Sequence, residues 1–102
     1  MSAATESPEF QELARKVGEK VRAIRKERSM SQLQLATRIG VDIKTVQNIE
    51  LGQSSRRGQP SNPQLDTMWA IAGALGVDVV YFLRDEPADD PRPTGSADPD
   101  DR

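Results

Sequence analysis

Two glycines, Gly40 and Gly52, divide the segment 31–52 into two short helices, and this division constrains the fold more than any other feature of the chain. Ser31 can cap the first helix, because its hydroxyl can accept a hydrogen bond from an otherwise unpaired backbone N–H, and Asp42 can open the second helix in the same way. Each glycine stands where a helix has to end, since glycine adopts the left-handed conformation without a clash from a Cβ atom. The segment therefore predicts a helix, a tight turn and a second helix.

The second of these helices, residues 42–50, has two chemically distinct faces. Val46 and Ile49 are three residues apart and point to the same side, which we expect to face the core. The opposite side carries three polar residues, Lys44, Gln47 and Asn48. Ile43 and Thr45 flank this polar face. In helix-turn-helix proteins such a helix enters the major groove of DNA, where amide, ammonium and apolar groups can each meet a base edge. The alternative is a solvated face, because these residue types are common on any surface.

Four runs of sequence extend this pattern over most of the chain: VRAIRKERSMSQLQLA, IGV, TVQNIELG and IAGALGVDVVYFL. Their order and spacing, from Val17 to Leu83, resemble the DNA-binding domain of the phage repressor and Cro family, the xenobiotic-response-element type of helix-turn-helix. The resemblance implies an all-α fold, a compact repressor-like bundle of five helices. It also implies a transcriptional regulator that binds double-stranded DNA as a homodimer on a palindromic operator, with repression the commoner outcome.

The resemblance gives Arg25 and Glu50 a structural role, as a buried ion pair between the first helix and the recognition helix. An uncompensated buried charge costs several kcal/mol, so we expect Glu50→Ala to destabilise the fold. As a surface pair, the two residues would contribute only about 0–1 kcal/mol.

The resemblance also implies which residues meet DNA. Ser31 and Gln32 begin the first motif helix, whose N-terminus can face a phosphate. Thr45 flanks the recognition face, and Arg56 and Arg57 lie in the long loop that follows it, where they can neutralise phosphates without reading sequence. Two solvated loop arginines are the alternative for that pair. Base readout is expected from Ile43, Lys44, Gln47 and Asn48.

An amphipathic helix is predicted from Ser7 to about Arg28, because Pro8 suits the first helical position and an apolar stripe follows it. The stripe consists of Phe10, Leu13, Val17, Val21 and Ile24. This helix begins earlier than the first helix usual in the family. Phe10 and Leu13 therefore need a covering surface, which is either the domain's own core or a dimer interface.

A fourth helix is predicted to start at Asn62 and Pro63 and to end at Gly76. Its inner face is expected to include the single tryptophan, as part of a stripe formed by Leu65, Met68, Trp69, Ala72 and Leu75. The tryptophan is therefore predicted to lie in the core.

The run 77–83 is predicted to form a short fifth helix capped by Asp78, although its β-branched and aromatic residues also favour a strand. Not all of its apolar side chains can face one small core. Val80 and Tyr81, together with Phe10 and Leu13, are therefore candidates for a dimer interface, and packing at the edge of the domain is the alternative.

Charge divides the chain into two parts. Residues 1–83 contain 11 lysines and arginines against 9 acidic residues, a net charge of +2, whereas residues 84–102 contain 3 against 7, a net charge of −4. The second part is rich in proline and has no large apolar residue, so it is expected to be disordered. We therefore predict a disordered N-terminus at 1–6, a DNA-binding domain at 7–83 and a disordered acidic tail at 84–102. The tail either competes with DNA for the basic face or only adds solubility.

Composition argues against an enzyme, because the chain has no histidine, no cysteine and no glycine-rich phosphate loop. No metal or cofactor is expected, and no membrane segment is present, so a cytoplasmic, DNA-associated protein of a bacterium or phage is predicted. Two other functions remain open under the same resemblance. One is an antitoxin-type module that binds a toxin or another regulator and represses its own operon. The other is an immunity repressor of a phage or integrated element.

Overall fold

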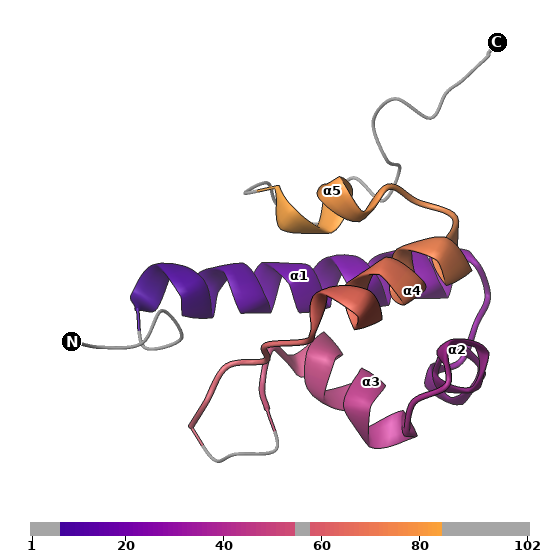
Figure 1. Cartoon of the computed structure of the whole chain (residues 1–102), viewed down its shortest axis with the longest axis horizontal. Coiled ribbons are helices and arrows are strands. Elements are labelled where there is room, and N and C mark those ends of the chain that lie inside the picture. Colours follow the sequence, from indigo (N-terminus) through magenta and orange to yellow (C-terminus); the bar gives the residue numbers. More distant parts are fainter. Residues whose placement is uncertain (1–6, 55–57, 85–102) are drawn as a thin grey trace, which may run out of the picture.

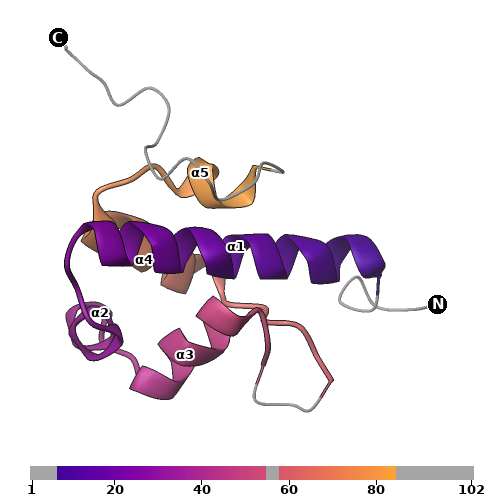
Figure 2. The ribbon, with the colours of Figure 1, turned by 180° about the vertical axis from the view of Figure 1, so that it is seen from behind.

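The computed structural model describes residues 7–54 and 58–84, and these residues form five α-helices (Figure 1). The helices are α1 (Pro8–Glu27), α2 (Gln32–Ile39), α3 (Ile43–Leu51), α4 (Leu65–Leu75) and α5 (Val79–Leu83). The predicted all-α fold of five helices is therefore confirmed. From both sides, α1 runs through the middle, with α5 along one edge and α2 and α3 along the other (Figure 1, Figure 2). The disorder predicted for 1–6 and for most of the acidic tail concerns residues outside the described part.

The long helix α1 starts and ends where the sequence predicts. Ser7 Oγ accepts a hydrogen bond of 3.0 Å from the backbone N–H of Phe10, and Pro8 occupies the first turn. The helix has 20 residues and ends at Glu27, with Arg28 in the C-cap position. Because it contacts α3, α4 and α5, this one helix organises the core.

Local capping also explains the two motif helices. Ser31 Oγ accepts from the backbone N–H of Gln34 at 3.0 Å, and Gln34 Oε1 accepts from the backbone N–H of Ser31 at 2.7 Å, which completes a capping box. Gly40 ends α2 with a φ of 78°. Asp42 stands at the N-cap position of α3, but its side chain makes no capping hydrogen bond.

The helices α1 and α3 approach each other at a distance that only glycine permits. A Cβ atom on Gly18 would lie 2.7 Å from the carbonyl oxygen of Glu50, and one on Gly52 would lie 2.9 Å from the Cα atom of Arg15. Gly52 also ends α3 with a φ of 71°, in the left-handed region. The end of the recognition helix is thus seated directly on the backbone of α1.

The core joins all five helices. Its buried apolar members are Val17, Val21, Ile24, Leu35, Ala36, Val46, Ile49, Met68, Ile71, Ala72, Leu75, Tyr81 and Phe82. The inward direction predicted for Val46 and Ile49 is therefore confirmed.

The prediction for the start of α4 was wrong. The helix begins at Leu65, with Gln64 in the N-cap position, and not at Asn62 and Pro63. The preceding residues 61–64 lie outside the helix, and Ser61 is instead buried, with its backbone N–H donating to the carbonyl oxygen of Gly52 at 3.0 Å.

The inner face predicted for α4 was also wrong in part. Trp69 is 72% exposed and Leu65 is 73% exposed, so neither belongs to the core. Apolar side chains occupy most of the circumference of this helix, so their pattern does not define one inner face. The neighbouring helices cover the arc formed by Met68, Ile71, Ala72 and Leu75.

The last element, α5, is a helix and not a strand. Asp78 Oδ1 accepts from the backbone N–H of Val80 at 3.1 Å, as the capping prediction requires. Arg84 was predicted to begin the disordered tail, but its carbonyl oxygen accepts a hydrogen bond of 2.6 Å from Lys20 Nζ, a group buried in the core. Its guanidinium carbon also lies 5.8 Å from the centre of the Tyr81 ring. Arg84 therefore belongs to the folded part.

Candidate functional site

The recognition helix α3 displays the residues that the sequence assigns to DNA. Ile43 and Lys44 are exposed, whereas Thr45, Gln47 and Asn48 are half-buried. Because Val46 and Ile49 hold the other side of the helix in the core, this face cannot turn inward. The helix therefore presents one apolar, one cationic and two amide side chains along a single edge of the molecule.

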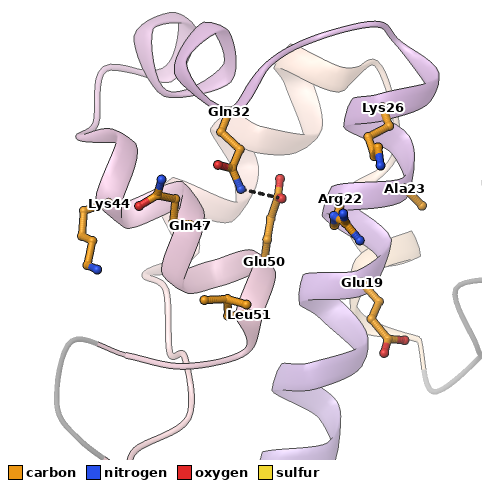
Figure 3. A pocket seen from close by; sticks show the side chains of 9 residues that line it. All are labelled: Glu19, Arg22, Ala23, Lys26, Gln32, Lys44, Gln47, Glu50 and Leu51. Atoms are coloured by element: carbon orange, nitrogen blue, oxygen red, sulfur yellow. Dashed lines mark hydrogen bonds between the residues drawn. The ribbon is translucent and has the colours of Figure 1, made fainter.

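A cleft of about 670 Å³ opens on the surface between α1, α2 and this helix (Figure 3). Its walls carry Glu19, Arg22, Ala23 and Lys26 from α1, Lys44, Gln47, Glu50 and Leu51 from α3, and Gln32 from α2. The cleft thus brings three of the predicted DNA-contacting residues together, namely Gln32, Lys44 and Gln47.

Arg22 and Lys26 are the residues of this cleft that the sequence reading missed. Both are exposed, and they stand one turn apart on α1, opposite the cationic side chain of Lys44 (Figure 3). Their spacing of four residues places them on one helical face, which is the only sequence signal they offer. Nothing in that signal indicates that the face borders α3, so only the fold identifies them as members of the site.

A buried network sets the position of α3 relative to α1 and α2. Arg25 Nε lies 2.6 Å from Glu50 Oε2, and Arg25 Nη2 lies 3.1 Å from Glu50 Oε1. The two side chains are only 9% and 2% exposed, so this is the buried ion pair that the resemblance implied. Arg25 Nη1 also donates to the carbonyl oxygen of Met30 at 2.7 Å, which ties the pair to the turn before α2.

Gln32 extends this network to the start of α2. Its Nε2 donates to Glu50 Oε1 at 3.1 Å (Figure 3). Ser31, beside it, is exposed and uses its hydroxyl to cap α2. The first turn of α2 is therefore held at a defined place beside the recognition helix.

The loop between α3 and α4 is closed at its base by backbone hydrogen bonds. Besides the Ser61–Gly52 bond, the backbone N–H of Ser54 donates to the carbonyl oxygen of Gln59 at 3.0 Å. Arg56 and Arg57, which the sequence assigns to the DNA backbone, lie outside the described residues.

The four residues proposed for a dimer interface do not form one exposed surface. Val80 is 54% exposed, but Tyr81 is 4% exposed, because its ring packs against Phe82 and the ammonium of Lys20. The assignment of Tyr81 to a surface was therefore wrong. Phe10 and Leu13 are half-buried and line a small apolar cavity of about 90 Å³ with residues of α4 and α5, and Leu13 packs against the domain's own core.

In the described part of the chain, no helix is long and apolar enough to cross a membrane. The same residues contain no group of three or more potential metal ligands.

Comparison with known proteins agrees with this architecture. Residues 21–82 match the helix-turn-helix family, a match that includes α2, α3 and the Arg25–Glu50 pair. The chain is also 37% identical over 70 residues to an immunity repressor protein of Bacillus phage phi105. That alignment covers 69% of this chain and 44% of the relative, so the chain spans less than half of the relative's length. Because the family match covers more than half of the chain, the protein belongs to the helix-turn-helix family.

Proposed function

We propose that this protein is a DNA-binding transcriptional repressor that places α3 in the major groove of its operator. The observation that carries the proposal is the buried network of Arg25, Glu50 and Gln32, which holds the exposed face of α3 beside the N-terminus of α2. A recognition helix must be held rigidly relative to the groups that contact phosphate, because those contacts set its register on the duplex. The name of the phage relative supports repression as the outcome.

The proposal divides the surface into two kinds of contact. Base edges meet α3, where Asn48 and Gln47 suit adenine, Lys44 suits guanine and Ile43 suits a thymine methyl group. Phosphates meet the residues around the groove: Ser31, Gln32, Thr45, Arg56 and Arg57, with Arg22 and Lys26 across the cleft. No catalytic step, metal or cofactor is part of this function, and we expect the protein to act in the cytoplasm, on DNA.

A homodimer completes the proposal. Two copies related by a two-fold axis would place their α3 helices in successive major grooves about 34 Å apart, which requires a palindromic site. Repression then follows from occupancy of a promoter.

The decisive experiment is selection of bound sequences from random duplex DNA, performed at low and at physiological salt. We expect enrichment of an inverted repeat whose half-sites are centred one helical turn apart, because a two-fold protein reads a two-fold site. Selection with the Asn48→Ala protein should relax one base position in each half-site and leave the spacing unchanged. Enrichment of no sequence, together with binding that disappears as salt rises, would contradict the proposal.

A further inference from the structure

The outer face of α4 carries two large apolar side chains that the described part of the chain does not cover. Leu65 and Trp69 stand one helical turn apart on this face, and both are largely exposed. One turn further along, Gly73 has open space where a Cβ atom would stand, because no atom of the described residues beyond its chain neighbours and the backbone of its own helix lies within 4 Å. Tryptophan is on average a well-buried residue, and an exposed apolar patch marks a contact site.

We propose that this face of α4 is a contact between two copies of the chain, with their α4 helices antiparallel across a two-fold axis. A two-fold contact uses the same patch twice, so the patch must complement itself. The indole side chain of Trp69 protrudes from this face, and Gly73, four residues away, leaves a surface position without a side chain. An antiparallel pair centred near Ile71 brings Trp69 of each copy level with Gly73 of the other, so the ring lies where no side chain opposes it.

The charges at the two ends of the face support the same arrangement. Asp66 is exposed in the first turn of α4. At the other end, Arg28 Nε donates to the carbonyl oxygen of Leu75 at 2.9 Å, and Arg28 Nη1 donates to Glu27 Oε1 at 2.7 Å, which places an Arg28–Glu27 ion pair at the end of the helix. The antiparallel pair brings Asp66 of one copy level with Gly76 of the other, beside its Arg28. Each Asp66 therefore lies beside the Arg28–Glu27 pair of the other copy and away from the other Asp66, whereas a parallel pair would bring the two Asp66 carboxylates together.

A second copy fits this face better than DNA or the acidic segment of the chain. The helix itself carries Asp66 and no lysine or arginine, and Arg28 at its end is already bonded to Leu75 and Glu27, so the face offers little to a phosphate. Residues 85–102 contain no apolar side chain larger than proline, so the acidic segment has no group to cover the indole ring.

The contact is small, and this limits its strength. One helix pair covers less than the roughly 800 Å² per partner that stable interfaces bury, so the two copies associate weakly in free solution. Association becomes effective when DNA holds two copies close together, because the second contact is then intramolecular. This step rests on the proposed function, whereas the contact itself does not.

Trp69 is the chain's single tryptophan, so its fluorescence reports the contact directly. We expect the full-length protein, raised from about 1 to 500 µM, to move from monomer to dimer in sedimentation, with a matching blue shift of the tryptophan emission as water leaves the indole. A monomer with unshifted emission over the whole range, with operator DNA present as well as without it, overturns the proposal.

Gly73→Ala is the sharpest variant, because the added methyl group meets open space in the monomer and the opposing indole in the dimer. The dissociation constant of the dimer should rise about tenfold, as expected when a packed contact receives an extra methyl group. The melting temperature measured at low concentration should not fall. Val80→Ser, on the exposed side of α5, is the comparison. If Val80→Ser abolishes the dimer and Gly73→Ala does not, the contact lies on α5 and the proposal is overturned.

Charge reversal tests the antiparallel arrangement. In a Glu27→Gln background, which removes the ion-pair partner of Arg28, Asp66→Arg should weaken the dimer, and combining it with Arg28→Asp should restore the dimer because both unlike pairs form again. A melting curve of the double variant shows whether loss of the Arg28 bond to α4 has unfolded the chain. If the double variant is folded and still does not dimerise, the antiparallel arrangement is contradicted.

Binding to a single half-site separates this proposal from the proposed function. Gly73→Ala should bind one half-site as the unchanged protein does and lose affinity only for the inverted repeat. If the protein dimerises through α4 but binds no duplex DNA, the contact between copies is supported and the repressor function is contradicted.

Discussion

The ammonium group of Lys20 in α1 donates to the carbonyl oxygen of Tyr81 in α5 at 3.1 Å, across a separation of 61 residues. The same ammonium donates to the carbonyl oxygen of Arg84 at 2.6 Å and lies 5.2 Å from the centre of the Tyr81 ring. Lys20 is completely buried. A helix as short as α5 cannot be stable by itself, so this lysine anchors it to the domain by binding the carbonyl groups at its end.

Lys20→Met tests this anchor. Methionine retains the apolar stem but leaves the carbonyl oxygens of Tyr81 and Arg84 without this donor, so we expect the free energy of unfolding to fall by about 1–3 kcal/mol. The change in the free energy of unfolding is measured by urea denaturation, with circular dichroism as the signal. Lys26→Met, an exposed lysine of the same helix, is the control and should change stability by less than about 0.5 kcal/mol. Equal stability of the two variants would show that Lys20 contributes nothing beyond its stem.

Glu50→Ala removes one member of the buried ion pair and leaves the Arg25 guanidinium without its carboxylate. The unpaired buried charge should cost about 3–5 kcal/mol, so the melting temperature should fall sharply. Calorimetry on the DNA-free protein makes the measurement independent of operator binding. Thr45→Ala, on the same helix but outside the network, is the comparison. An unchanged melting temperature for Glu50→Ala would show that the ion pair does not contribute to the stability of the fold.

Gly18→Ala and Gly73→Ala form a matched pair, because each adds one methyl group inside a helix. At Gly18 the new Cβ would stand 2.7 Å from the carbonyl oxygen of Glu50, so α1 and α3 must separate and stability should fall by about 1–3 kcal/mol. At Gly73 the Cβ meets open space, so stability should rise by up to about 1 kcal/mol. Thermal melts at low concentration compare the two. A stabilised Gly18→Ala protein is the result that would falsify the close approach.

Asn48→Ala should alter specificity without altering the fold. If the Asn48 amide pairs with an adenine, its loss costs about 1–3 kcal/mol at one base pair and little on random DNA. The measurement is the ratio of the affinity for the selected operator to the affinity for a scrambled duplex, at one salt concentration. A lower ratio for Asn48→Ala assigns Asn48 to base readout. An equal loss on both duplexes would move Asn48 from base readout to general affinity.

Arg22→Ala and Lys26→Ala should show the opposite pattern. Each removes one cation from the cleft beside α3, so affinity should fall on all sequences alike, and the slope of log K against log salt should become shallower by about 1. Lys16→Ala is the control, since Lys16 lies on α1 beside Leu83, away from the cleft. A salt slope that stays the same for both cleft variants excludes them from the phosphate contacts.

Much of the fold could be predicted because its signals are local. Ser7, Ser31 and Asp78 cap the helices that they were expected to cap, and Gly40 and Gly52 end the helices that they were expected to end. Each of these residues acts on backbone groups a few positions away, so the information lies in adjacent residues. The Arg25–Glu50 pair was also anticipated, but from the family resemblance and not from the spacing of the two residues.

The errors have a common physical origin. Trp69 and Leu65 were placed in the core because they are apolar, yet α4 is apolar around most of its circumference and its neighbours cover another arc. Tyr81 was assigned to a dimer interface because not all apolar side chains of the last helix can face one small core. The burial of a lysine ammonium against its ring has no signature in the sequence.

By itself, the sequence determined where the helices other than α4 begin and end, which face of α3 is apolar and which family the chain resembles, because these depend on residues close together in the chain. Only the tertiary structure decided that Lys20 anchors α5, that Gly18 seats α3, that Arg22 and Lys26 border the recognition helix and that Trp69 faces outward. Each of these depends on which distant surface covers a side chain. That choice is made by the packing of whole helices against one another, which no single segment encodes.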